Sequence, residues 1–154
     1  MSRKLARVLE KIEHAGATPT LRQIRRGVEK ESLRVDANGT LSQLPHPPGL
    51  GSPLTHPSIT TDYSEALLEF ITPVEESVAG VLNQLEKTHR FAYQHLHQER
   101  LWVTSMPCIV HGDNSIPIAR YGSSNIGQMK HFYRVGLSSR YGRLMQAIAG
   151  IHYN

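Results

Sequence analysis

Residues 27–35 constrain the fold of this chain more than any other stretch. Their sequence, GVEKESLRV, mixes apolar and charged residues and is followed by turn residues at 36–40, which predicts a β-strand that ends in a turn. Side chains two apart on a strand point the same way, so Glu29 and Glu31 share one face about 7 Å apart. Unpartnered carboxylates are costly in a core but suit hard cations, which can bridge to substrate phosphates. The same pattern also fits a solvated edge strand with two ordinary surface glutamates.

The size and composition indicate one globular domain, residues 1–154, with a core of its own. Hydrophobic residues make up 39% and charged residues 19%, which is typical of a soluble protein and not of a disordered one. No apolar run is long enough to span a membrane, and the Ser-Arg-Lys start does not resemble a signal sequence. The single cysteine, Cys108, agrees with a reducing compartment. We therefore expect a cytoplasmic protein without a membrane partner, and a packed Cys108.

The net charge of +4 is unevenly distributed. Residues 1–35 hold nine Lys or Arg against four Glu, and the remaining residues hold eight against nine acidic ones. A basic N-terminal third raises a nucleic-acid-binding module as a hypothesis, although such clusters also occur as solvated faces or as sites for smaller phosphates. Aromatic residues are not interleaved with the basic ones, as they are on RNA-binding sheets. We expect no nucleic-acid partner.

Three segments have the apolar spacing of helices. Leu5, Val8, Leu9 and Ile12 predict an amphipathic helix that packs by one face, with Ser2 as its N-cap. Residues 75–99 predict the longest helix, and residues 129–148 predict another.

Two further segments alternate like strands. Residues 67–72 predict a strand that ends at Pro73, with a helix from Ser64 as the competing interpretation. Glu69 would lie in the middle of that strand, where its carboxylate needs a metal ion or an arginine as partner. Residues 149–154 also alternate, and the sequence stops there without a turn or cap, so we expect a fragment of a longer protein. The proline-rich residues 44–57 predict an irregular loop whose histidines, His46 and His56, face solvent.

These segments contain a series of motifs that resembles the N-terminal portion of glutamate–cysteine ligase of the gamma-proteobacterial type. Each motif alone is modest evidence, but their joint order along nearly the whole chain is specific. The motifs are RGVEKESLRV at 26–35, GTL at 39–41, LGS at 50–52, LTH at 54–56, ITTD at 59–62, EALLEFITPV at 65–74, SMPC at 105–108, RYG at 140–142, and Gly150 with HYN at 152–154.

The resemblance implies an α+β fold similar to glutamine synthetase, in which an antiparallel sheet forms a funnel with helices outside it; this chain would form a partial funnel. It also implies an enzyme that joins the γ-carboxylate of L-glutamate to the amine of L-cysteine, the first step of glutathione biosynthesis. ATP would be the co-substrate, γ-glutamyl phosphate the intermediate and Mg²⁺ or Mn²⁺ the cofactor. The resemblance also implies a monomeric protein.

The resemblance also assigns site residues. Five positions correspond to metal ligands of the family: Glu29, Glu31, Asp62, Glu69 and His152. Four correspond to its cysteine pocket: Tyr63, Tyr133, Leu137 and Gln146. The family often has phenylalanine at the position of Tyr63. A further metal ligand, the arginine that binds glutamate and most of the ATP pocket are expected outside this chain, so an inactive truncated fragment is the alternative.

Overall fold

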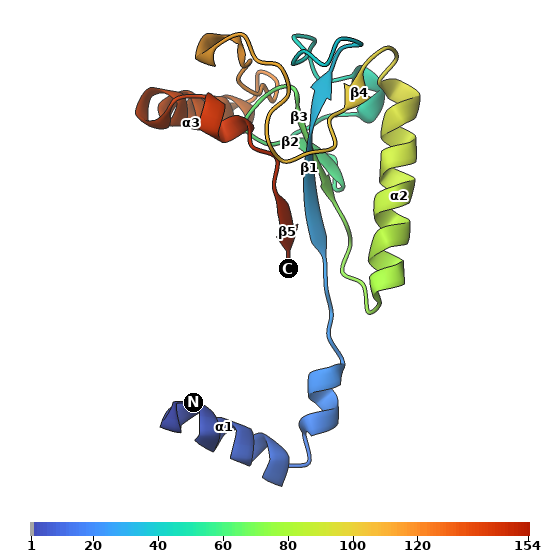
Figure 1. Cartoon of the computed structure of the whole chain (residues 1–154), viewed down its shortest axis with the longest axis vertical. Coiled ribbons are helices and arrows are strands. Elements are labelled where there is room, and N and C mark those ends of the chain that lie inside the picture. The colour runs from blue at the N-terminus through green and yellow to red at the C-terminus, as the bar shows by residue number, and fades with distance from the viewer. Residues whose placement is uncertain (1) are drawn as a thin grey trace.

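A five-stranded antiparallel sheet organises the computed structural model, which describes residues 2–154 (Figure 1). Its central strand is β1 (Val28–Val35), with β3 (Leu67–Ile71) on one side and β2 (Ile59–Thr61) beyond β3. On its other side, β5 (Ile151–Tyr153) pairs with the start of β1 and β4 (Arg100–Leu101) with its end. The expected α+β fold with an antiparallel sheet is therefore confirmed.

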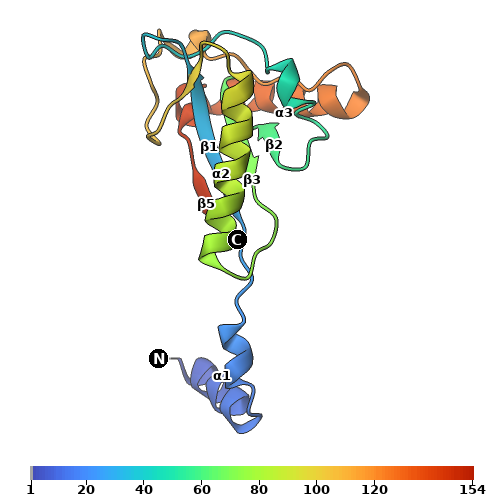
Figure 2. The same cartoon turned by 90° about the vertical axis from the view of Figure 1, so that its right-hand side faces the viewer.

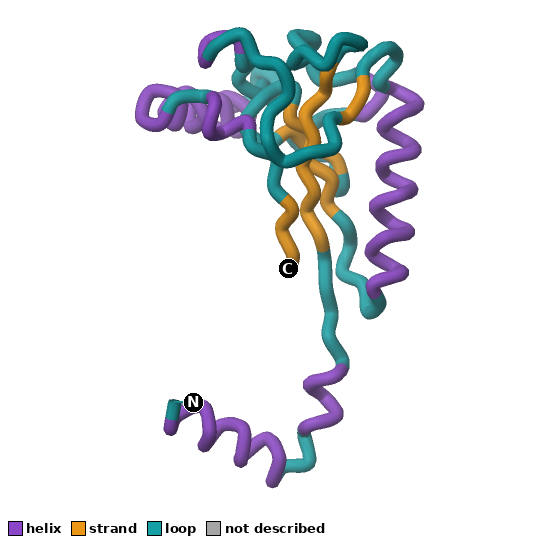
Figure 3. Tube along the Cα trace, viewed as in Figure 1, coloured by secondary structure: helices purple, strands orange, loops and turns teal. Residues whose placement is uncertain are grey.

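The sheet separates two helical layers. α2 (Val78–His95) begins after its N-cap Ser77 and packs on the face of Leu68 and Phe70. α3 (Asn125–Tyr141) begins after Ser124 and lies toward the opposite face, where its Leu137 packs against the core around Leu33 and Leu67. The loops gather mainly at the end of the sheet farthest from the N-terminal helix (Figure 3). Four short 3₁₀ helices complete the part of the chain that the structure describes: η1 (Thr18–Arg22), η2 (Pro48–Leu50), η3 (Asp113–Ser115) and η4 (Leu144–Ala147).

The alternation of β1 divides its side chains between the two layers. Ser32 lies opposite Leu68, on the α2 side, whereas Glu31 lies opposite Glu69, on the α3 side. Directly opposed residues in an antiparallel pair share a face. On the α3 side of the sheet, an apolar core therefore packs against the C-terminal part of β1, and carboxylates lie along its N-terminal part.

The N-terminal helix forms as predicted but does not pack as predicted. α1 (Arg3–His14) begins after Ser2, whose side chain accepts a hydrogen bond from the Lys4 N–H. None of its residues is buried, and Leu5, Val8 and Leu9 are 49%, 46% and 43% exposed. The helix lies beyond an extended segment, apart from the sheet (Figure 2). The expectation that one face packs is wrong within the described residues, because no other element there reaches it.

The histidines of the proline-rich loop also differ from expectation. His46 is buried, and its backbone N–H donates to Glu65 Oε1 at 2.9 Å, which holds the loop against the core. Burial, together with the nearby Arg34 charge, lowers the pKa of His46 to about 4. His56 is half-buried, and its Nδ1 accepts from the N–H groups of Ser58 and Ile59.

The third predicted helix ends earlier than its apolar spacing indicates. α3 stops at Tyr141, and Gly142 follows with a φ of +74°, which glycine adopts without a steric penalty. Asp113 Oδ1 then accepts the N–H groups of Arg143 and Leu144, which fixes the turn before η4. No helix within residues 2–154 is both long and apolar enough to cross a membrane.

Candidate metal centre

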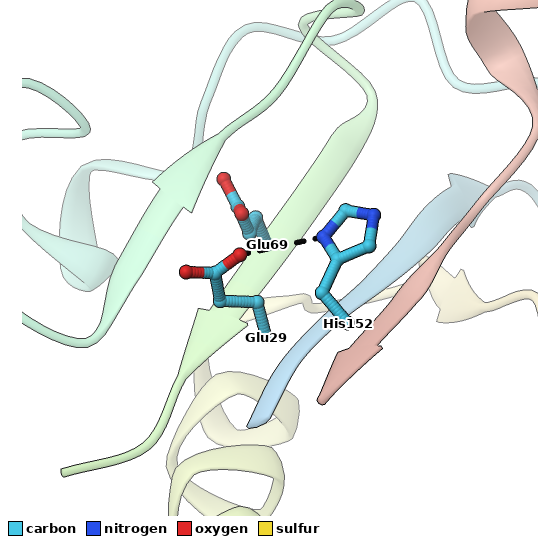
Figure 4. A group of neighbouring side chains, drawn as sticks. All are labelled: Glu29, Glu69 and His152. Atoms are coloured by element: carbon cyan, nitrogen blue, oxygen red, sulfur yellow. Dashed lines mark ion pairs between the residues drawn. The ribbon is translucent and has the colours of Figure 1, made fainter. Parts of the chain in front are cut away.

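The register of the sheet brings sequence-distant ligand groups onto one face. Glu29 on β1 lies opposite His152 on β5, and Glu31 lies opposite Glu69 on β3. All four side chains therefore belong to the α3 side of the sheet. Figure 4 shows Glu29, Glu69 and His152 converging from three different strands.

Three of the predicted ligands form a tight group. One ligand atom each from Glu29, Glu69 and His152 lies within 4.8 Å of the other two. Glu29 Oε2 is 3.3 Å from His152 Nδ1, and both side chains remain partly exposed. Ligands of a single Mg²⁺ ion lie about 2.1 Å from it, and thus up to about 4.2 Å apart. A small inward shift would let these three hold one cation.

The other two predicted ligands, Glu31 and Asp62, lie beside this group. Glu31 Oε2 accepts the Gly150 N–H at 2.7 Å, which fixes the carboxylate against β5. Burial raises the pKa of Glu31, the Gly150 hydrogen bond opposes that rise, and the Asp62 charge adds to it. The Asp62 charge also raises the pKa of Glu69. The structure thus brings all five predicted residues to one region, with Glu29, Glu69 and His152 nearest to each other.

The charge balance of this region is unfavourable without a cation. Burial, followed by the charges of Asp62, Glu31 and Glu29, raises the pKa of Glu69 to about 7. Within residues 2–154, none of the ion pairs joins these carboxylates to lysine or arginine. The alternative of an arginine partner for Glu69 is therefore not realised, and a divalent cation would supply the missing positive charge.

Two residues that hold Asp62 in place were not identified from the sequence. The Tyr121 hydroxyl lies 2.7 Å from the Thr61 carbonyl oxygen and 2.8 Å from that of Asp62, and donates to this pair. Arg134 on α3 donates to the Asp62 carbonyl and lies over the Tyr121 ring, 4.8 Å from its centroid. The contacts join segments far apart in the chain, so no local pattern indicates them.

Gly150 is a third supporting residue. A Cβ atom at this position would lie 2.8 Å from His152 Nε2. The absence of a side chain at Gly150 therefore leaves room for the imidazole, while its N–H holds Glu31.

The residues predicted for a cysteine pocket are only partly gathered. Tyr63 is buried in the core cluster against which Leu137 packs, and no hydrogen-bond partner for its hydroxyl lies within residues 2–154. Gln146 is half-buried in η4, next to Ala147 of the same cluster. Tyr133 is 61% exposed, one turn before Leu137 on α3.

Sequence comparison identifies the class of protein. The family model described as glutamate-cysteine ligase matches residues 9–154. A glutamate–cysteine ligase of Alcanivorax borkumensis is 60% identical over 141 residues, which are 92% of this chain and 27% of the relative. The glutamate–cysteine ligase of Pseudomonas aeruginosa PAO1 is 58% identical over 154 residues, which are 100% of this chain and 29% of the relative. The chain belongs to the glutamate–cysteine ligase family, and it spans less than a third of the length of these relatives.

Two solved structures contain the same fold. A Francisella tularensis glutamate–cysteine ligase in complex with AMP aligns with a TM-score of 0.81 and 48% identity, over 84% of this chain and 26% of that one. A bifunctional glutathione synthetase from Pasteurella multocida aligns with a TM-score of 0.80 and 33% identity, over 92% of this chain and 18% of that one. Most of the fold described above therefore recurs within longer chains.

Proposed function

We propose that residues 1–154 form a single, N-terminal part of the catalytic domain of an ATP-dependent glutamate–cysteine ligase, and that this part carries metal ligands. The observation that carries the proposal is the convergence of Glu29, Glu69 and His152 in a chain of this family. The reaction is the joining of the glutamate γ-carboxylate to the cysteine amine in glutathione biosynthesis, in the cytoplasm. The crowded carboxylates disfavour a nucleic-acid partner, because they would repel backbone phosphates.

The reaction has two steps in which charge must be stabilised. A γ-carboxylate oxygen of glutamate attacks the γ-phosphorus of ATP, and ADP leaves. The cysteine amine then attacks the carbonyl carbon of γ-glutamyl phosphate, inorganic phosphate leaves, and the amine loses a proton. A bound divalent cation would offset negative charge on the phosphates during transfer.

The donor set indicates which metals fit. Carboxylate oxygens from Glu29 and Glu69 favour Mg²⁺, and the imidazole of His152 makes Mn²⁺ equally suitable. Glu31, held by the Gly150 N–H, and Asp62, held by Tyr121 and Arg134 through its carbonyl, would complete the ligand set. Because ligands bind metal when deprotonated, the raised pKa of Glu69 predicts that affinity increases as the pH rises through about 7.

We further propose that Tyr63, Tyr133, Leu137 and Gln146 line the cysteine site. The proposal is supported by the position of Tyr63 and Leu137 at the core cluster that contains Leu33 and Leu67, which lie on the same sheet face as the carboxylates. Tyr133→Ala in a complete enzyme should raise the KM for cysteine more than it lowers kcat.

A chimera tests the proposed function. The aligned part of the Pseudomonas aeruginosa relative is replaced by these 154 residues, and γ-glutamylcysteine formed from ATP, glutamate and cysteine is measured by mass spectrometry. The chimera should be active, Glu29→Gln should remove most of its turnover, and the 154-residue chain alone should form no product. Glu86→Gln is the matched control, because Glu86 is an exposed glutamate of α2 that pairs with Arg90. Near-normal turnover of Glu29→Gln at saturating Mg²⁺ would refute the metal assignment.

A further inference from the structure

A groove joins the candidate metal centre to the segment just before β1. Its volume is about 350 Å³, and its lining includes Glu29 of β1 together with Arg25 and Arg26. Gly27 and Asn154 also line it, and their backbones pair through two hydrogen bonds of 2.8 and 2.9 Å. Strand alternation puts Gly27 on the same face as Glu29, and the missing side chain leaves the space between them open. The groove therefore connects a carboxylate of the metal centre with two guanidinium groups.

The two arginines of this groove have no acidic partner within residues 2–154. None of the ion pairs there includes Arg25 or Arg26. Arg26 Nη2 donates to the Ile24 carbonyl at 3.2 Å, whereas its Nε is buried without an acceptor. Guanidinium groups bind phosphate and carboxylate oxygens through paired, charge-assisted hydrogen bonds. The arginines are therefore suited to an anionic ligand.

A cation at the metal centre determines which anion fits the groove. Without a cation, the Glu29 carboxylate would repel an anion. With a divalent cation held by Glu29, Glu69 and His152, the groove has positive charge both at the metal centre and at the arginines. A matching ligand carries negative charge on several neighbouring groups, as a triphosphate does. The two carboxylates of glutamate are separated by a carbon chain, and cysteine has only one.

We propose that this groove receives the triphosphate of ATP, and that Arg25 and Arg26 bind the phosphates farthest from the metal centre. The inference rests on the proposed function, because it takes ATP as the co-substrate. It assigns the phosphate end of the nucleotide site to this chain, and it predicts that the phosphates reach the metal centre from the N-terminal end of β1.

This assignment separates the nucleotide from the proposed cysteine site. Tyr63 and Leu137 pack at the core cluster that contains Leu33. Leu33 lies six positions after Gly27, which corresponds to about 20 Å along a strand. The metal centre lies between these two positions. The phosphoryl donor and the attacking amine can therefore reach a glutamate γ-carboxylate at the metal centre from opposite ends of β1.

Other anions fit the groove less well. An acidic protein segment could neutralise Arg25 and Arg26, but it would bring further carboxylates beside Glu29. A single inorganic phosphate offers one phosphorus centre to charged groups that lie on both sides of Gly27. Both alternatives are outcomes of the test.

Calorimetry on the 154-residue chain tests the proposal, with inorganic triphosphate as the probe and Mg²⁺ in excess. Arg25→Gln with Arg26→Gln should weaken triphosphate binding by about tenfold, as expected for lost charge-assisted hydrogen bonds, and leave the Mg²⁺ affinity unchanged. Arg25→Lys with Arg26→Lys keeps the charge and should restore part of the affinity. Inorganic phosphate should bind more weakly than triphosphate, and omission of Mg²⁺ should also weaken triphosphate binding.

A control variant separates the groove from general attraction between charges. Arg3→Gln with Arg7→Gln removes the same two charges from α1 and should leave triphosphate binding unchanged. An equal loss with this control would overturn the proposal. So would unchanged binding by the Arg25/Arg26 variant, phosphate binding as tight as triphosphate binding, or no triphosphate binding at all.

The chimera described above distinguishes this inference from the proposed function. In an active chimera, Arg25→Gln with Arg26→Gln should raise the KM for ATP by about tenfold and leave the KM for cysteine unchanged. Equal changes in the two KM values would show a general structural effect and contradict the proposal. A chimera that forms no γ-glutamylcysteine, but binds triphosphate through the two arginines, would support this inference while contradicting the proposed function.

Discussion

The charged side chains at the two ends of β1 have opposite surroundings: at one end they have partners of opposite charge, and at the other they crowd together. Near its C-terminal end, Arg34 is fully buried, and its guanidinium donates to both oxygens of Glu99, at 2.9 and 2.7 Å, and to the carbonyls of Leu44 and Glu65. Near its N-terminal end, Glu29 and Glu31 lie beside Glu69 and receive no lysine or arginine from residues 2–154. Within the described residues, the charge near the C-terminal end of β1 is balanced by an ion pair, and the carboxylates near its N-terminal end are not balanced by a lysine or arginine.

This difference gives the C-terminal end of β1 a structural role and its N-terminal end a functional one. A buried charge with its own partner and hydrogen bonds stabilises a particular fold, and Nε is the one donor of Arg34 found without an acceptor. Carboxylates that crowd together at a partly exposed position reduce stability unless something else supplies positive charge. We therefore expect substitutions near the C-terminal end of β1 to act on folding and those near its N-terminal end to act on cation binding.

The largest effect should come from Arg34→Met. This change leaves the Glu99 carboxylate buried without its partner, which typically costs about 3–5 kcal/mol. Urea unfolding of the 154-residue chain measures it. The exposed Arg90–Glu86 pair is the control, and Arg90→Ala should change the free energy of unfolding by less than about 1 kcal/mol. Equal effects of the two substitutions would contradict the claim that the buried Arg34–Glu99 pair stabilises the fold.

Glu69→Gln should have the opposite sign at alkaline pH. The pKa of Glu69 is raised from 4.5 to about 7, so the folded state binds a proton more tightly than the unfolded state does. Its contribution to stability is then fully present below pH 4.5 and is lost as the pH rises through about 7. The metal-free variant should be the more stable one at pH 8, whereas the wild-type chain should gain more from added Mn²⁺.

The effect of pH on stability is best measured as the difference between the Glu69→Gln chain and the wild-type chain. His46, whose pKa is lowered to about 4, acts in the other direction: its contribution is lost as the pH falls from 6.5 through about 4. It is present in both chains and cancels in the difference. Melting curves from pH 4 to 8 should show the gap between variant and wild type growing above pH 4.5. A gap that does not change with pH would show that Glu69 has an ordinary pKa.

A smaller effect is expected for Gly150→Ala. The new Cβ would lie 2.8 Å from His152 Nε2, so the imidazole must leave its present position beside Glu29. Disturbing the support of a ligand in this way typically weakens metal binding by about tenfold. Isothermal titration with Mn²⁺ measures it, and Gly136→Ala, within α3, is the control. Unchanged affinity would remove His152 from the site.

The sequence predicted the helices and strands better than the tertiary contacts around them. β1, β3, β5 and the Ser2 cap of α1 follow from local periodicity and capping chemistry, and the structure confirms them. The burial of His46 and the turn that follows α3 depend on contacts with Glu65 and Asp113, which no local pattern contains.

The candidate site, too, could be predicted only in part from local sequence patterns. Strand alternation alone places Glu29 and Glu31 on one face, but Asp62 and His152 were assigned through the family resemblance. Their approach to Glu69 depends on the register of four strands, β1, β2, β3 and β5, which is a property of the whole sheet. The role of all five as metal ligands stays a prediction.

Binding of Mn²⁺ to the isotopically labelled 154-residue chain at pH 8 tests the central claim most directly. Paramagnetic broadening in NMR spectra should appear first at Glu29, Glu69 and His152 and saturate with millimolar affinity. Glu29→Gln should weaken binding at least tenfold, while Glu86→Gln leaves it unchanged. Broadening that begins elsewhere, or equal binding by the Glu29→Gln chain, would contradict the claim that the open end of β1 is a metal site.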